Sequence, residues 1–101
     1  MPKELGNIRE ILPVLNEKNV AVIVKDKSSF TRLHKAVGDK VLLEFLDTNS
    51  DSLANDRIPC YSIFAAKGLE FPVVLVISDD MTKNQRIVAC TRATERLYYY
   101  E

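Results

Sequence analysis

Two uninterrupted apolar runs dominate the hydrophobic pattern, at residues 20–24 and 73–77. Every position in both runs is apolar, and most of the side chains are β-branched. Strands buried on both faces of a parallel sheet show this pattern, whereas strands with one face in water alternate apolar and polar residues. The two runs therefore predict two central strands of a parallel sheet.

Weaker patterns predict the remaining elements. Apolar residues at helical spacing indicate a short helix over residues 8–15, irregular at Pro13. A second helix is predicted from Ser28 and Ser29, as N-cap candidates, to Gly38. Further expectations are strands within 41–46, 58–64 and 97–100, a compact or helical turn over 65–69, and a helix over 85–93.

The alternation of strands and helices predicts an α/β fold, with an open, mainly parallel sheet and flanking helices. A chain of 101 residues, 47% of them apolar, suits one small domain with a single modest core. Residues 47–57 are rich in Asn, Ser and Asp and predict a flexible loop.

Charge and cysteine content narrow the function classes. Fourteen basic and fourteen acidic residues give a net charge of zero, whereas an autonomous nucleic-acid binder usually has a basic excess. Cys60 and Cys90 do not form a C-x-x-C pair and are expected to be buried, reduced thiols. The first residues lack an apolar signal region, and no apolar stretch approaches ~18 residues, so we expect a cytoplasmic protein without a membrane partner.

Two short segments carry the candidate chemistry. Residues 66–71 read Ala-Lys-Gly-Leu-Glu-Phe, and residues 88–93 read Val-Ala-Cys-Thr-Arg-Ala. They resemble the last two motifs of the second motor domain of UvrD/Rep/PcrA-like superfamily 1 helicases. This resemblance implies that residues 1–101 form a RecA-like C-terminal domain of a larger ATPase.

The resemblance also implies ATP as cofactor, an N-terminal motor domain in cis as partner, and Mg²⁺ held mainly by that other domain. The chain has no G-x-x-x-x-G-K-[ST] segment to cradle phosphates. We therefore expect no ATP hydrolysis by the isolated domain.

Arg92 and Glu70 are the main site residues that the resemblance implies. Arg92 would contact the γ-phosphate, because a guanidinium presents a charged planar fork to phosphate oxygens. Its structural alternative is a helix-terminal arginine bonded to Glu95 or to the last carbonyls of its helix. Glu70 would accept hydrogen bonds from the ribose hydroxyls of ATP, and its alternative is a solvated surface charge.

Lys67, Gly68 and Lys25 complete the implied nucleotide site. Gly68 allows unusual backbone angles and close approach of a ligand, and Lys67 would meet phosphate or stay hydrated. Lys25 ends a predicted strand at a position where the family segment carries a phosphate-binding arginine. Ligands of open α/β sheets bind beyond the carboxyl ends of strands, so we expect the loop with Lys67 and Gly68 at that edge.

Nucleic-acid contact is predicted less directly. The family carries a threonine and a histidine five and three residues before the motif lysine, where this chain has Ser62 and Phe64. Ser62 could donate to a phosphate and Phe64 could stack on a base. Because Phe64 continues an apolar run, we favour a buried core position for it.

Three functions follow from the resemblance. The favoured one is the C-terminal motor domain of an ATP-dependent DNA helicase or translocase that acts on single-stranded DNA. The interval from Lys25 to Ile58 is too short for the large accessory subdomain of the UvrD/Rep group, which favours the HelD-like branch and RNA polymerase as partner. The third is a non-catalytic RecA-like interaction module, since a fold alone does not establish activity.

Overall fold

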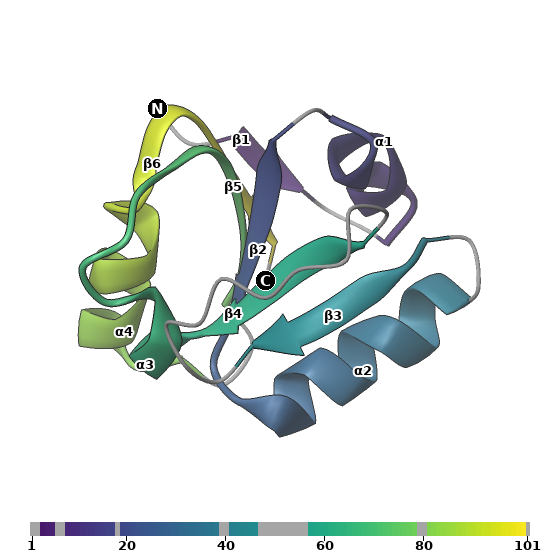
Figure 1. Cartoon of the computed structure of the whole chain (residues 1–101), viewed down its shortest axis with the longest axis horizontal. Coiled ribbons are helices and arrows are strands. Elements are labelled where there is room, and N and C mark those ends of the chain that lie inside the picture. Colours follow the sequence, from purple (N-terminus) through teal and green to yellow (C-terminus); the bar gives the residue numbers. More distant parts are fainter. Residues whose placement is uncertain are drawn as a thin grey trace.

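The computed structural model describes residues 3–5, 8–17, 19–38, 41–46, 57–78 and 81–100, and these form a six-stranded sheet flanked by helices (Figure 1). All strand pairs are parallel, in the order β1-β6-β5-β2-β4-β3. The prediction of an open parallel α/β sheet is confirmed. The strands are β1 (Lys3–Leu5), β2 (Val20–Val24), β3 (Leu43–Leu46), β4 (Ile58–Ser62), β5 (Phe71–Ile77) and β6 (Ala93–Tyr100).

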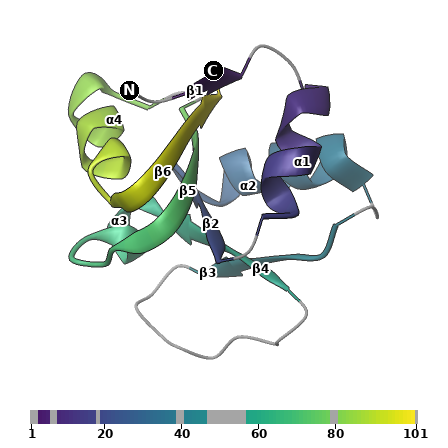
Figure 2. The same ribbon diagram turned by 90° about the horizontal axis from the view of Figure 1, so that it is seen from above.

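The helices cover the sheet on both faces. They are the 3₁₀ helix η1 (Ile8–Glu10), α1 (Ile11–Leu15), α2 (Lys27–Val37), α3 (Ile63–Ala66) and α4 (Lys83–Cys90). Figure 2 shows α1 and α2 on one side of the sheet and α3 and α4 on the other. Among the described residues, no helix is long and apolar enough to cross a membrane.

The central strands supply both halves of the core. Val22 and Val24 of β2 pack toward the helices α1 and α2, whereas Ala21 and Ile23 pack toward α3 and α4. All five β2 side chains are buried, as are the last five of β5. The predicted double-sided burial of these strands is therefore confirmed.

The start of α2 differs from the prediction. Asp26 is the N-cap, and its Oδ1 accepts a hydrogen bond from the Ser29 backbone N at 3.1 Å. Ser29 itself lies inside the helix and is buried. Aspartate is a strong N-cap residue, and the two serines that follow it are also cap formers, so the sequence did not distinguish between them.

Other elements also differ from the prediction, and one prediction is not tested. The apolar run over residues 58–64 is divided between β4 and α3, because Ser62 caps a helical turn there. Strand β1 was not predicted, and it pairs with the end of β6. The predicted loop over 47–57 lies, except for Arg57, outside the described residues.

Candidate nucleotide site at the amino ends of β5 and β6

A single helical turn brings the first motif to the sheet edge. The Ser62 Oγ accepts from the Ala65 backbone N at 3.1 Å and starts α3. Gly68 then adopts a φ of +81°, a conformation that other L residues rarely take. A Cβ at Gly68 would meet no atom within 4 Å, so this glycine is required by the backbone conformation alone. The turn ends with Glu70, directly before β5.

This arrangement corrects the expected edge of the site. Glu70 precedes β5 and Arg92 precedes β6, so both lie at the amino ends of their strands. The rule about carboxyl ends applies to the loop that directly follows a strand. Here α3 occupies that position and returns the chain to the opposite edge before Gly68 and Glu70 are reached.

Arg92 is fixed by the end of α4. Its Nε donates to the carbonyl of Val88 at 3.2 Å, and one terminal nitrogen donates to the Thr91 Oγ1 at 3.1 Å. Its backbone N donates to the Ala89 carbonyl at 3.2 Å. The guanidinium thus satisfies a carbonyl at the C-terminus of its helix, which is the structural alternative that the sequence left open.

Arg92 also forms hydrogen bonds with the residues on both sides of Glu70. The other terminal nitrogen of Arg92 donates to the Leu69 carbonyl at 3.4 Å, and the Arg92 carbonyl accepts from the Phe71 N at 2.8 Å. The residues before and after Glu70 are therefore both bonded to Arg92. The bonds of the guanidinium to Val88, Thr91 and Leu69 use three of its five N–H groups, which leaves two for a ligand.

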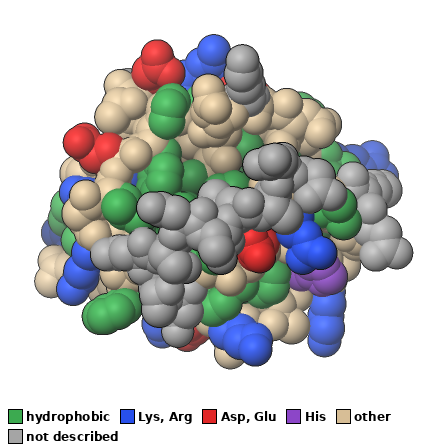
Figure 3. Space-filling view, viewed as in Figure 1, with side chains coloured by type: hydrophobic (Ala, Val, Ile, Leu, Met, Phe, Trp, Pro, Cys, Tyr) green, Lys and Arg blue, Asp and Glu red, His purple; other side chains and the backbone are tan. Residues whose placement is uncertain are grey.

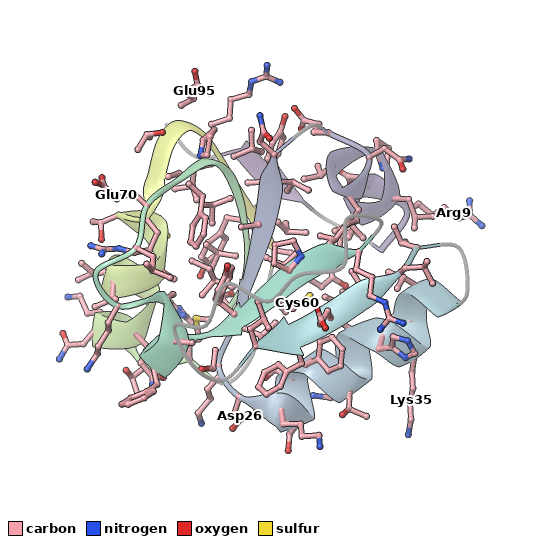
Figure 4. The ribbon with its side chains drawn as sticks, viewed as in Figure 1. Arg9, Asp26, Lys35, Cys60, Glu70 and Glu95 are labelled. Atoms are coloured by element: carbon pink, nitrogen blue, oxygen red, sulfur yellow. The ribbon has the colours of Figure 1, made fainter. Side chains whose placement is uncertain are left out.

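The Glu70 side chain is exposed beside these hydrogen bonds. Figure 4 shows its side chain extending outward from the edge of the molecule. A parallel pair with Phe71 opposite Ala93 keeps the starts of β5 and β6 adjacent. The structure therefore brings the two principal motif residues together, with a carboxylate and a half-buried guanidinium at one edge.

The remaining nucleotide candidates divide between two edges. Lys67 is the exposed C-cap residue of α3 and lies on the turn that leads to Glu70. Lys25 follows the carboxyl end of β2, at the opposite edge of the sheet. Because a five-residue strand spans roughly 16 Å, Lys25 does not join Glu70 and Arg92 in this domain.

The two nucleic-acid candidates differ in exposure. Ser62 is 2% exposed and its hydroxyl caps α3, so the geometry does not favour a direct phosphate contact. Phe64 is 73% exposed, so the expectation of a core position was wrong. The helical turn directs Ile63, Ala65 and Ala66 inward and leaves Phe64 in solvent.

An aromatic hollow beside Glu70 was missed by the sequence analysis. It has a volume of about 440 Å³ and lies at the amino ends of β2, β4 and β5. The Tyr61 and Phe71 rings meet within it, with centroids 4.9 Å apart. Its lining includes Asn19, Ala21, Pro59, Tyr61, Phe71 and Pro72. The sequence signal that could have indicated it was Phe71-Pro72, directly after Glu70. Figure 3 shows that hydrophobic side chains reach the surface on one face of the molecule.

The two thiols are separate from this site chemistry. Cys60 is fully buried in β4, and desolvation strongly raises the pKa of its thiol. Burial also raises the pKa of the Cys90 thiol at the end of α4. Both thiols are therefore protonated near neutral pH and are weak nucleophiles.

The parallel sheet, in which Arg92 bonds to the residues on both sides of Glu70, has the architecture of a RecA-like α/β domain. Residues 9–101 match the family model of the viral superfamily 1 RNA helicase core domain, and the chain belongs to this family.

A solved structure has the same fold. It is the C-terminal domain of a possible DNA helicase from Lactobacillus plantarum WCFS1, with a TM-score of 0.79 and 22% identity over 98% of this chain and 72% of that one. A comparison with curated proteins found no match.

Proposed function

We propose that this chain is the second motor domain of an ATP-driven superfamily 1 helicase or translocase. Glu70 binds the ribose of ATP, and Arg92 contacts the γ-phosphate. The observation that carries the proposal is the bonding of Arg92 to the residues on both sides of Glu70. This bonding keeps a carboxylate acceptor and a guanidinium near the amino ends of the same two strands. The carboxylate suits the neutral ribose hydroxyls of a nucleotide, and the guanidinium suits its anionic phosphates.

Arg92 supplies the electrostatic part of the reaction. Charge develops on the oxygens of the transferred phosphoryl group, and a pre-positioned guanidinium stabilises it without reorganising at the moment of reaction. The bonds to Val88 and Leu69 hold the side chain in place before ATP arrives. Lys67, on the adjacent turn, adds a hydrated positive charge at the rim.

The ATP phosphates and Mg²⁺ are held mainly by the first motor domain in cis. The chain carries no G-x-x-x-x-G-K-[ST] loop, and among the residues that the structure describes no three His, Cys, Asp or Glu side chains converge as a metal site. The isolated domain is accordingly inactive, and closure of the two domains around ATP assembles the complete site.

Nucleic acid contacts the opposite edge. Phe64 lies on α3, directly after the carboxyl end of β4, and its exposed ring offers a face on which a single-stranded base can stack. Lys25 follows the carboxyl end of β2 at the same edge and can meet the phosphate backbone. The roles of Lys25 and of the Glu70–Arg92 pair are thus separated across the sheet.

RNA polymerase is the second candidate partner. Between β2 and β4 the described residues form only α2 and β3, which leaves no room there for a large accessory subdomain. This short interval favours a HelD-like remodelling ATPase over a UvrD-like DNA helicase. Stimulation of ATP turnover by single-stranded DNA or RNA supports the helicase, whereas stable association with RNA polymerase and little stimulation support the remodeller.

The test is Arg92→Ala in a protein that contains both motor domains. ATP turnover should fall on the order of 10³-fold, as for loss of an arginine finger. Arg92→Lys should recover little, because the ammonium lacks the planar fork. Arg96→Ala is the matched control, since Arg96 is exposed on β6, the strand that Arg92 directly precedes, and pairs with Glu17. Turnover by Arg92→Ala equal to that of the control would identify a non-catalytic interaction module instead.

A further inference from the structure

Three hydrogen bonds join the side chains of Thr91 and Arg92 at the end of α4. The Thr91 hydroxyl donates to the carbonyl of Val88 at 2.9 Å and accepts from Nη2 of Arg92 at 3.1 Å. Nε of Arg92 donates to the same Val88 carbonyl at 3.2 Å. The two side chains therefore form a closed ring of hydrogen bonds over one carbonyl at the C-terminus of the helix.

The chemistry of the three groups fixes the direction of each bond. A carbonyl only accepts and a guanidinium only donates, whereas a hydroxyl has one donor and two acceptor sites. The Thr91 proton therefore points to Val88, and a lone pair of its oxygen is left for Arg92. A side chain of the same shape without the hydroxyl, such as valine, would leave Nη2 without this acceptor.

The ring determines which part of the guanidinium faces away from the helix. Nε and Nη2 lie on one edge of the planar group, and both are bonded to the end of α4. Nη1 adds a longer bond of 3.4 Å to the Leu69 carbonyl. The N–H groups that remain are carried by the two terminal nitrogens, at the tip of the side chain, where a planar fork can meet two phosphate oxygens.

Thr91 restricts a rotation that the bond from Nε alone would allow. A single hydrogen bond leaves the guanidinium plane free to turn about it, and the 3.4 Å bond to Leu69 is longer than the usual N–H···O range. The shorter bond to the Thr91 oxygen holds the plane in one orientation. Orientation before the ligand arrives affects the rate, because a displacement of about 1 Å can cost on the order of 10²-fold.

We propose that Thr91 is a positioning residue of the nucleotide site, and that its hydroxyl orients the Arg92 guanidinium toward the γ-phosphate. The inference rests on the proposed function, because it concerns the group that is proposed to contact that phosphate. The Thr91 side chain is exposed, and the bond from its backbone N to the Ile87 carbonyl, at 3.1 Å, does not depend on the side chain. The hydroxyl is therefore available for Arg92 rather than required by the core.

The test is Thr91→Val in a protein that contains both motor domains. The kcat for ATP should fall on the order of tenfold, as for loss of one hydrogen bond to a charged group. KM for ATP should change little, because the charge that Arg92 stabilises develops in the transition state. Thr91→Ser, which retains the hydroxyl, should restore kcat. Thr31→Val is the matched control, since the exposed Thr31 hydroxyl also donates to a helix carbonyl at 2.9 Å, but on α2, across the sheet (Figure 2).

A double variant separates positioning from a purely structural role. With Arg92→Ala in place, Thr91→Val has no guanidinium left to orient, so it should lower kcat no further. An undiminished loss in the Arg92→Ala background would show that Thr91 acts through the fold or on the substrate itself, and it would overturn the inference.

The inference and the proposed function fail in different ways. If Arg92→Ala lowers turnover and Thr91→Val does not, Thr91 is not a positioning residue and the proposed function stands. If neither substitution lowers turnover, the roles of Arg92 and Thr91 are both refuted. A kcat of Thr91→Ser as low as that of Thr91→Val would also refute the inference, because the hydroxyl would then not be the group that matters.

Discussion

Substitution of Gly68 by alanine tests the backbone geometry on which the site depends. Gly68 has a φ of +81°, and no atom lies within 4 Å of the position that a Cβ would occupy. The cost is therefore conformational rather than steric, and a left-handed residue with a Cβ costs roughly 1–2 kcal/mol. In a domain of this size each kcal/mol lowers the melting temperature by about 4–8 °C. Gly68→Ala should show a loss in this range by thermal and urea denaturation.

Gly38 offers the matched comparison. It has a φ of +65° and a ψ of −146° at the end of α2, and its Cβ position is also open. Gly38→Ala should cost at least as much stability, because that region is almost restricted to glycine. Only Gly68→Ala should also weaken ATP binding, since only Gly68 directs the chain to Glu70. Unchanged stability of Gly68→Ala, or equal nucleotide affinity of the two variants, would refute the reasoning.

Three further predictions concern stability and the nucleic-acid edge. Thr82→Ala removes the capping box with Gln85 at the start of α4 and should lower the free energy of unfolding by about 1 kcal/mol, measured in urea. The raised pKa of Cys60 means that the folded state favours the neutral thiol, so stability is complete below the unfolded thiol pKa of ~8.5 and falls as pH rises above it. Urea denaturation should show a shallower alkaline decline for Cys60→Ala, and an identical slope would contradict this assignment. Phe64→Ala should change stability by less than about 0.5 kcal/mol but weaken single-strand binding by the full motor protein by about 1–3 kcal/mol. A large stability loss would show that the Phe64 ring packs in the core.

The two uninterrupted apolar runs of the sequence predicted the centre of the sheet well. The run at residues 20–24 is β2 without a change of boundary, and the run at 73–77 forms most of β5. Both are buried on two faces, and burial on two faces requires a continuous apolar run, which is visible in the local sequence. Short elements were harder: β1 has only three residues and is held by pairing with β6, which no local pattern reveals.

The candidate site was predictable in its residues but not in its placement. The resemblance of two short segments to helicase motifs indicated Glu70 and Arg92, and hydrogen bonds join Arg92 to the residues on both sides of Glu70. Which end of the strands carries the site depends on whether the residues after β4 continue a strand or form a helical turn. That choice is made by the cap at Ser62, within an apolar run that suits either structure. The same turn determines the exposure of Phe64.

The pairing of β1 with β6 has a consequence for the order of folding. Lys3 lies opposite Tyr98, so the earliest strand of this chain to leave the ribosome can join the sheet only after the latest one has emerged. Pairings between such distant positions form slowly, because a long loop must close before any contact compensates for its entropy. During synthesis β2, β4 and β5 can associate first, and β6, which Arg92 directly precedes, is added together with β1 at the end. The segment proposed to contact ATP is thus assembled late in translation.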